Sequence, residues 1–216
     1  MEVRRWTLDP DINDSMVGMG GPPPDVLERL IKERTPIEEA APKVGDQAPD
    51  FEAERLSHDG ERTGEIVRMS DFKGHKVAFL FGSYTCPIYR GQIERFNEIY
   101  QELKDKYQFL NIYTREAHPE DGWRLDINSR QGVEYNQPTN SDERASIVKT
   151  CMIRNNIDMP MALDNMNDEI EKLYSGSPER LYIIDENGIV RHRSGRGPFD
   201  MEMIEAWYDA LISQAS

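Results

Sequence analysis

The chain has 216 residues, of which 38% are hydrophobic and 31% are charged, and its formal net charge is −14. This length suits one domain with an additional arm, and this composition is typical of a globular protein rather than a disordered one. The negative charge argues against a nucleic-acid backbone or an anionic membrane surface as partner. No segment approaches the roughly 20 consecutive apolar residues that a membrane-spanning helix needs.

The cysteines and the start of the chain predict the compartment. Residues 1–16 contain basic side chains but neither an apolar core nor a cleavage signal, so they do not resemble a secretory signal. The two cysteines, Cys86 and Cys151, are far apart and do not form a disulfide framework. We therefore expect a cytoplasmic protein. The histidines show no metal-ligand spacing, and no metal site is predicted.

Residues 1–43 differ in composition from the rest of the chain and form a predicted N-terminal arm. The segment MVGMGGPPP at 16–24 has the composition of a linker. A short amphipathic helix is predicted from Asp25, and Thr35-Pro36 should end it. This helix could pack on a second subunit, or it could fold back on its own domain. Residues 44–216 are predicted to form that domain.

From residue 44 onward, strand and helix signals alternate. The segment VGDQAPDFEAERL at 44–56 contains proline and predicts an extended stretch with an edge strand. A short strand is expected at 66–69 and a fully buried one at the apolar run 77–81. A helix should follow Cys86, and the apolar run 109–114 predicts a second buried strand. This strand–helix–strand unit predicts two parallel strands with a right-handed crossover.

The second half of the domain continues the alternation after a polar loop at 115–140. The remaining predicted elements are a helix capped by Ser141-Asp142, a strand at 161–163, a helix through 170–174, a hairpin over 181–192 and a closing helix over 203–212. The whole pattern predicts an α/β fold with a central mixed sheet and helices on both faces.

Cys86 is the first candidate functional residue. Gly82-Ser83 end the preceding strand, and Pro87 occupies the first-turn position in which proline suits a helix. The unpaired N–H groups and the dipole of a helix N-terminus favour a thiolate over a thiol. We expect this cysteine to be exposed and to act as a nucleophile, whereas the alternative is a buried, inert cysteine.

The string YTREAHPEDGW at 113–123 is the second candidate site. It begins at the carboxyl end of the second parallel strand, beside the turn that carries Cys86, and ligands bind at this end of open α/β sheets. Glu116 could orient His118, and the histidine could move a proton near neutral pH. A solvated loop, in which the histidine only bonds nearby backbone, is an equally good interpretation.

The position of Cys86 is that of the reactive cysteine in thioredoxin-fold redox proteins, and residues 44–87 resemble the opening of the peroxiredoxin-like branch of that fold. Position 89 is Tyr89 and not a second cysteine, so a disulfide oxidoreductase is not expected. The peroxidase motif is incomplete, because Thr85 directly precedes the cysteine and the turn before it contains no proline.

Three segments resemble the iodothyronine deiodinases: GSYTCP at 82–87, YTREAHPEDGW at 113–123 and SPERLYIIDENGIVRHRSGRGP at 177–198. Cys86 stands where those enzymes usually carry selenocysteine. The resemblance covers roughly residues 44–212 and does not include the N-terminal arm. It implies a thioredoxin-like fold and a tendency to form homodimers.

The resemblance also implies residue roles: Cys86 as nucleophile, Ser83 and Thr85 as its hydroxyl neighbours, Tyr113, Glu116 and His118 as a proton network, and Arg180 as a substrate-binding residue. The chain departs from the family pattern in three ways. Tyr84 replaces a cysteine that often resolves the oxidised nucleophile, a second histidine is missing near 135–137, and no N-terminal membrane anchor is seen. Cys151 is the remaining candidate resolving thiol, although its apolar neighbours favour buried packing.

These observations predict a deiodinase-like thiol oxidoreductase with no bound cofactor. In this hypothesis Cys86 removes iodine from an aromatic, phenolic small molecule, and an external thiol (thioredoxin, glutathione or a dithiol) regenerates it. One alternative is a peroxiredoxin-like peroxidase, in which Cys86 becomes a sulfenic acid. A second alternative is a redox-sensing or binding module without catalysis.

Overall fold

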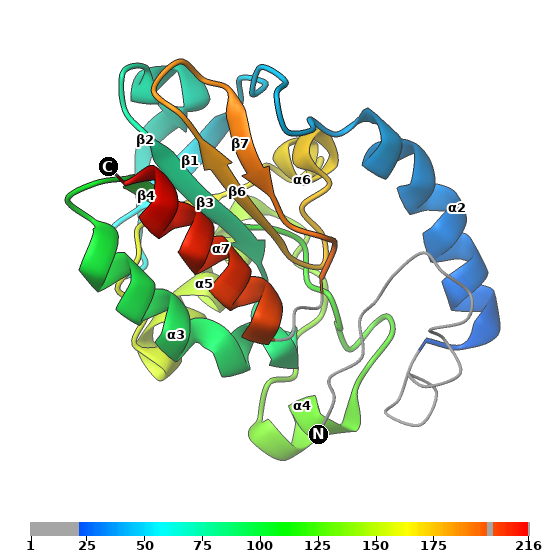
Figure 1. Cartoon of the computed structure of the whole chain (residues 1–216). Coiled ribbons are helices and arrows are strands. Elements are labelled where there is room, and N and C mark those ends of the chain that lie inside the picture. Colours follow the sequence, from blue (N-terminus) through cyan, green and yellow to red (C-terminus); the bar gives the residue numbers. More distant parts are fainter. Residues whose placement is uncertain (1–21, 198–200, 216) are drawn as a thin grey trace.

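The computed structural model describes residues 22–197 and 201–215. In this part of the chain, one mixed sheet has the strand order β2-β1-β5-β4-β3-β6-β7 (Figure 1). The strands are β1 (Glu52–Leu56), β2 (Arg62–Arg68), β3 (Val77–Gly82), β4 (Gln108–Tyr113), β5 (Met161–Leu163), β6 (Arg180–Ile184) and β7 (Val190–Arg193). The helices are α2 (Pro24–Ala40), η2 (Met69–Phe72), α3 (Pro87–Leu103), α4 (Asp126–Gln131), α5 (Ser141–Asn155), α6 (Glu169–Tyr174) and α7 (Met201–Gln214).

The sheet separates two hydrophobic cores. Helices α3, α5 and α7 supply apolar side chains to one core, which contains Cys86 and Trp207. Helix α6 and η2 supply the other core, where Phe79, Tyr174 and Tyr182 pack ring against ring. In Figure 1, α3 and α7 accordingly lie in front of the sheet. The predicted mixed sheet with helices on both faces is confirmed.

The central pair β3 and β4 positions the candidate site. The two strands are parallel along their whole length, from Val77 beside Gln108 to Gly82 beside Tyr113. Every residue of β3 is buried, as expected for a strand covered on both faces. Because parallel strands end at the same edge of a sheet, the Cys86 turn and the loop after Tyr113 meet there.

Two predicted elements differ from the observed ones. Strand β1 is not an edge strand, because it pairs with both β2 and β5. The edge on this side of the sheet is β2, which is longer than the predicted 66–69 and is mostly exposed and polar, as is typical of edge strands. The polar loop at 115–140 contains the short helix α4, which its sequence did not predict.

The prediction that the first helix ends at Thr35-Pro36 is wrong, because α2 continues through Pro36 to Ala40. Ion pairs on both sides of the proline hold the helix against the domain. Before it, Arg34 binds Glu171 of α6; after it, Glu38 binds Arg180 and Arg193 at the start of β6 and the end of β7. These tertiary contacts compensate for the backbone hydrogen bond that proline cannot make.

The ion pairs of α2 with α6, β6 and β7 also show where this part of the N-terminal arm lies. Helix α2, blue in Figure 1, lies beside α6 of the same chain. The described part of the arm therefore folds back on its own domain, which was one of the two alternatives. A domain boundary at residues 43/44 stays a prediction.

No helix within residues 22–197 or 201–215 is both long and apolar enough to cross a bilayer.

Candidate active site

Cys86 lies at the N-cap of α3, as its sequence position predicts. Its backbone is extended, Pro87 begins the helix, and the Sγ atom accepts a hydrogen bond from the Tyr89 N–H at 3.5 Å. The prediction that this cysteine is exposed is wrong, since only 2% of its surface reaches solvent. The thiol lies in the core between the sheet and α3, so a substrate must displace covering side chains to reach it.

The surroundings of Cys86 oppose the expected thiolate. Burial raises the pKa of the thiol well above its usual value, and the negative charge of Glu179 raises it further. The backbone N–H groups of Ile88 and Tyr89 act in the opposite direction and lower that pKa. In the resting structure burial and the carboxylate outweigh the helix N-terminus, and the thiol form is favoured.

Glu179 was not singled out from the sequence, although it lies in the SPERLY string. Its Oε1 atom lies 3.6 Å from Cys86 Sγ, and only 1% of the residue is exposed. The alternation of a buried strand could have revealed it. Along β6, Arg180 and Tyr182 face one core, so Glu179 and Leu181 face the other, where the thiol lies.

Four hydrogen bonds join the Cys86 turn to the loop that follows β4. The Tyr84 N–H binds the Tyr113 hydroxyl at 2.8 Å, the Thr85 N–H binds Glu116 at 2.9 Å, the Ala117 N–H binds the Ser83 hydroxyl at 3.1 Å and the His118 N–H binds the Thr85 hydroxyl at 3.0 Å. The structure thus brings together all the predicted residues of the two motifs. The Ser83 and Thr85 hydroxyl oxygens accept bonds from the loop backbone, which gives them a positioning role.

Glu116 does not orient His118 as expected. Its carboxylate accepts hydrogen bonds from the Tyr113 hydroxyl and from the Thr85 N–H. Burial raises the pKa of the carboxyl group, while these two donors lower it. Glu116 therefore fixes the geometry of the turn before Cys86 through Tyr113 and Thr85.

His118 is instead oriented by Trp123. Its Nδ1 atom lies 3.2 Å from the Trp123 carbonyl, and the two rings meet edge to face with centroids 4.4 Å apart. Because a carbonyl only accepts, Nδ1 carries the proton in the neutral ring. Burial lowers the pKa of His118 to about 4, so the imidazole is neutral near pH 7. This ring is poorly suited to donate a proton at neutral pH.

Arg180 lies on the opposite face of the sheet from the thiol. It pairs across the strands with Phe81, whose ring belongs to the core that excludes Cys86. Its guanidinium binds the carbonyls of Ser175 and Ser194 and the carboxylate of Glu38. These contacts hold Arg180 within the fold, and the substrate-binding role that the family resemblance implied stays a prediction.

Cys151 lies on α5 and is completely buried, which agrees with the packing interpretation. Both cysteines are free thiols. Burial raises the pKa of the Cys151 thiol, and Asn155 donates a hydrogen bond to its sulfur at 3.8 Å.

A further set of polar residues supports the site and was missed from the sequence. Gln137 accepts from the Glu116 N–H at 3.1 Å and donates back to the Glu116 carbonyl at 2.5 Å. Asn128 donates to the Thr85 carbonyl at 2.8 Å, and Arg90 bonds both Asn128 and the Tyr84 carbonyl. Polar loop residues carry no periodic signal, so only the fold identifies these contacts.

Gly82 is a position where the site tolerates no side chain. A Cβ atom there would lie 2.3 Å from the ring of Tyr89. The backbone N–H of the same tyrosine donates to the Cys86 sulfur. We expect Gly82→Ala to lower the free energy of unfolding by about 1–3 kcal/mol and to displace the thiol. Gly91→Ala on the exposed side of α3 is the matched control, because its Cβ would meet nothing within 4 Å. Urea unfolding measures the free energy of unfolding of both variants. Equal changes in the two variants would contradict this expectation.

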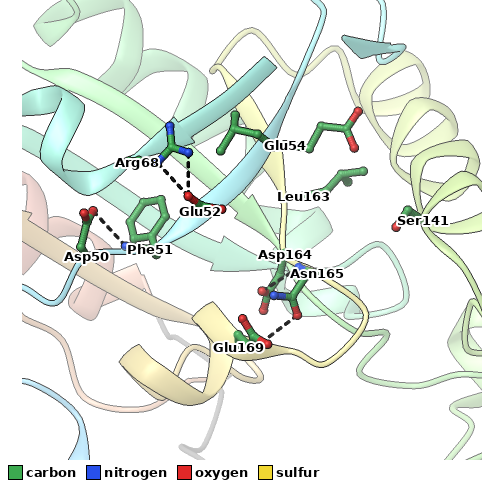
Figure 2. Close-up of a pocket in the computed structure, with 11 residues that line it drawn as sticks. Asp50, Phe51, Glu52, Glu54, Arg68, Ser141, Leu163, Asp164, Asn165 and Glu169 are labelled. Carbon is green, nitrogen blue, oxygen red and sulfur yellow. Dashed lines mark hydrogen bonds and ion pairs between the residues drawn. The ribbon is translucent and has the colours of Figure 1, made fainter. Parts of the chain in front are cut away.

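One surface cavity has a volume of about 540 Å³ and is lined mostly by acidic and polar side chains on or beside β1, β2 and β5 and at the starts of α5 and α6. Figure 2 shows Asp50, Glu52, Glu54 and Glu169 around it, with Arg68 bound to Glu52. Neither the Cys86 turn nor the loop after β4 contributes to its walls. Within the described ranges, no group of three or more His, Cys, Asp or Glu side chains is arranged to hold a metal ion.

Comparison with known proteins identifies the family. The family model for iodothyronine deiodinase matches residues 30–210. The chain belongs to the iodothyronine deiodinase family. It is 31% identical over 170 residues to a thyroxine 5-deiodinase of Gallus gallus, an alignment that covers 77% of this chain and 62% of the relative. It is 25% identical over 187 residues to a type II iodothyronine deiodinase of Rattus norvegicus, covering 80% and 70%. The chain thus spans about two thirds of the length of these deiodinases.

Solved structures confirm the thioredoxin-like fold of this deiodinase family member. The thioredoxin domain of a thiol-disulfide oxidoreductase from Bacteroides vulgatus matches with a TM-score of 0.55 at 17% identity, covering 81% of this chain and 99% of that one. PrxQ of Xylella fastidiosa matches with a TM-score of 0.56 at 9% identity, covering 81% and 98%. Family and fold together support an oxidoreductase.

Proposed function

We propose that the protein is a thiol-dependent oxidoreductase that removes iodine from a phenolic aromatic ring, with Cys86 as the nucleophile. One observation carries this proposal: the sulfur sits at the N-cap of α3 and is hydrogen-bonded there by the Tyr89 N–H, at the edge where β3 and β4 end. Membership of the iodothyronine deiodinase family supports the choice of iodine as the atom that the sulfur removes from the ring.

In the proposed reaction the sulfur attacks iodine, the carbon–iodine bond breaks, and the ring carbon takes up a proton. The enzyme is left as a sulfenyl iodide on Cys86. Two equivalents of an external thiol then restore the cysteine, releasing iodide and a proton and forming the thiol's own disulfide. We propose an external thiol because Cys151 is buried within α5 and is not disulfide-bonded to Cys86.

The test compares iodide release from an iodinated phenol with consumption of hydrogen peroxide, each with and without a dithiol. We expect dithiol-dependent iodide release that Cys86→Ser abolishes. Cys151→Ala is the matched control, since it removes the other thiol, and it should retain multiple turnovers. Peroxide consumption without iodide release would instead identify a thiol peroxidase, and no turnover of either compound would favour a non-catalytic module.

A further inference from the structure

The thiol of Cys86 and the carboxylate of Glu179 form a buried pair. The sulfur donates a hydrogen bond to Oε1 at 3.6 Å, and the two residues are 2% and 1% exposed. Glu179 directly precedes β6, whereas Cys86 lies in the turn after β3. The adjacent strands β3 and β6 therefore bring the two groups together.

The backbone around Glu179 is shaped to keep its carboxylate in place. The Gly197 N–H donates to the Glu179 carbonyl at 3.1 Å. A Cβ atom at Gly197 would lie 2.7 Å from the Glu179 Cβ and 3.0 Å from its Oε2. Any other residue at this position would push the glutamate, so glycine permits the close packing that directs the carboxylate towards the sulfur.

Charge limits what this pair can do. Two negative charges in contact within a core are strongly unfavourable, so a buried thiol and carboxylate share one proton. The thiolate can then form readily only when the carboxylate takes that proton. Arg90 interacts electrostatically with Cys86, but its guanidinium is engaged by the Tyr84 carbonyl and the side chains of Asn128 and Gln131. Glu116 is engaged by Tyr113 and Thr85.

We propose that Glu179 is a catalytic proton carrier, which accepts the thiol proton of Cys86 as the sulfur attacks iodine and then returns it to the ring carbon. This step rests on the proposed function and completes its balance. The sulfur–iodine bond forms with the electron pair left by the proton, the carbon–iodine bond breaks, and the carbon gains the same proton. An aryl iodide and a thiol thus become an arene and a sulfenyl iodide, with no outside acid.

His118 is a weaker source of this proton. Its neutral ring holds its one proton at Nδ1, against the Trp123 carbonyl. Giving that proton away would break the bond that orients the ring. Glu179 needs no such rearrangement, because it receives its proton directly from the reacting sulfur.

The decisive variant is Glu179→Gln, which keeps the shape but loses the negative charge and the proton acceptor. The titration of Cys86 is read from the ultraviolet absorbance of the thiolate, as the difference between each protein and its Cys86→Ser counterpart. Removal of the adjacent charge should move the midpoint of this titration to lower pH by about one unit or more. Iodide release should nevertheless fall by roughly 100-fold or more, because the proton carrier is gone.

This opposite response separates a proton carrier from a residue that only packs. Glu94→Gln, on the exposed side of α3, is the matched control and should change neither measurement. Glu179→Asp restores a carboxylate and should recover part of the iodide release, which guards against a folding defect in the glutamine variant. Glu179→Gln with unaltered iodide release, or with an unmoved titration, would overturn the proton step. A wild-type protein that releases no iodide would overturn the proposed function itself and this step with it.

Discussion

Glu171→Ala should lower the free energy of unfolding by about 3–5 kcal/mol, because it leaves the buried Arg34 guanidinium without its counter-charge. Glu171 is completely buried on α6, and both of its oxygens bind Arg34 of α2. It also accepts a hydrogen bond from the Ser177 N–H at 3.0 Å. The loss is a large fraction of the roughly 5–15 kcal/mol that stabilises an ordinary domain.

Urea unfolding monitored by circular dichroism measures this effect. Glu61→Ala is the control, because Glu61 and its partner Lys149 are exposed and such surface pairs contribute about 0–1 kcal/mol. The double variant Arg34→Met/Glu171→Met should recover much of the stability, since it leaves no uncompensated charge. If Glu171→Ala lowers the free energy of unfolding by less than about 1 kcal/mol, the Arg34–Glu171 pair does not hold α2 against the domain, and this prediction is wrong.

Acid should destabilise the protein partly through His118. Its folded pKa of about 4 lies below the 6.5 of an ordinary histidine because the ring is buried. Between these two values the unfolded chain binds a proton that the folded protein excludes. The contribution of His118 to the free energy of unfolding is therefore fully present above pH 6.5 and is lost as the pH falls towards 4. From pH 7.5 to pH 4.5 this loss in the free energy of unfolding is on the order of 2–3 kcal/mol.

His118→Gln should remove this part of the pH dependence, since glutamine does not titrate and its amide can still donate to the Trp123 carbonyl. The measurement is the free energy of unfolding of wild type and variant at both pH values. His58→Gln is the control, because His58 is exposed, and it should keep the wild-type slope. An identical slope in wild type and His118→Gln would show that the buried ring protonates freely in the folded state.

Most of the fold could be predicted because its signals are local. The apolar run 77–81, the Pro87 helix start and the apolar run 109–114 each report burial or backbone preference, and the structure confirms all three elements. The first helix shows where local signals fail. Pro36 predicted its end, but ion pairs with residues distant in sequence stabilise the turn beyond it.

The candidate site follows the same division. The predicted ends of the two parallel strands indicated that Cys86, Glu116 and His118 lie near one another. The structure confirms this, because the turn before Cys86 is hydrogen-bonded to both Glu116 and His118. Their mutual contacts could not be read from spacing, because each depends on the direction of a side chain within a packed core. Strand alternation places Glu179 and Arg180 on opposite faces of the sheet, but only the pairing of β6 with β3 brings Glu179 to the sulfur.

Three features of this protein could be predicted from its residues alone: a mixed α/β sheet, a cysteine that begins a helix after a central strand, and motifs that resemble those of the deiodinases. Backbone preference and hydrophobic periodicity are local properties, so a single chain displays them. The favoured protonation state of that cysteine depends instead on contacts that form when the chain folds. Burial and the Glu179 carboxylate, brought from a distant strand, outweigh the helix N-terminus, because electrostatic energy in a core depends on what lies within a few ångströms in space.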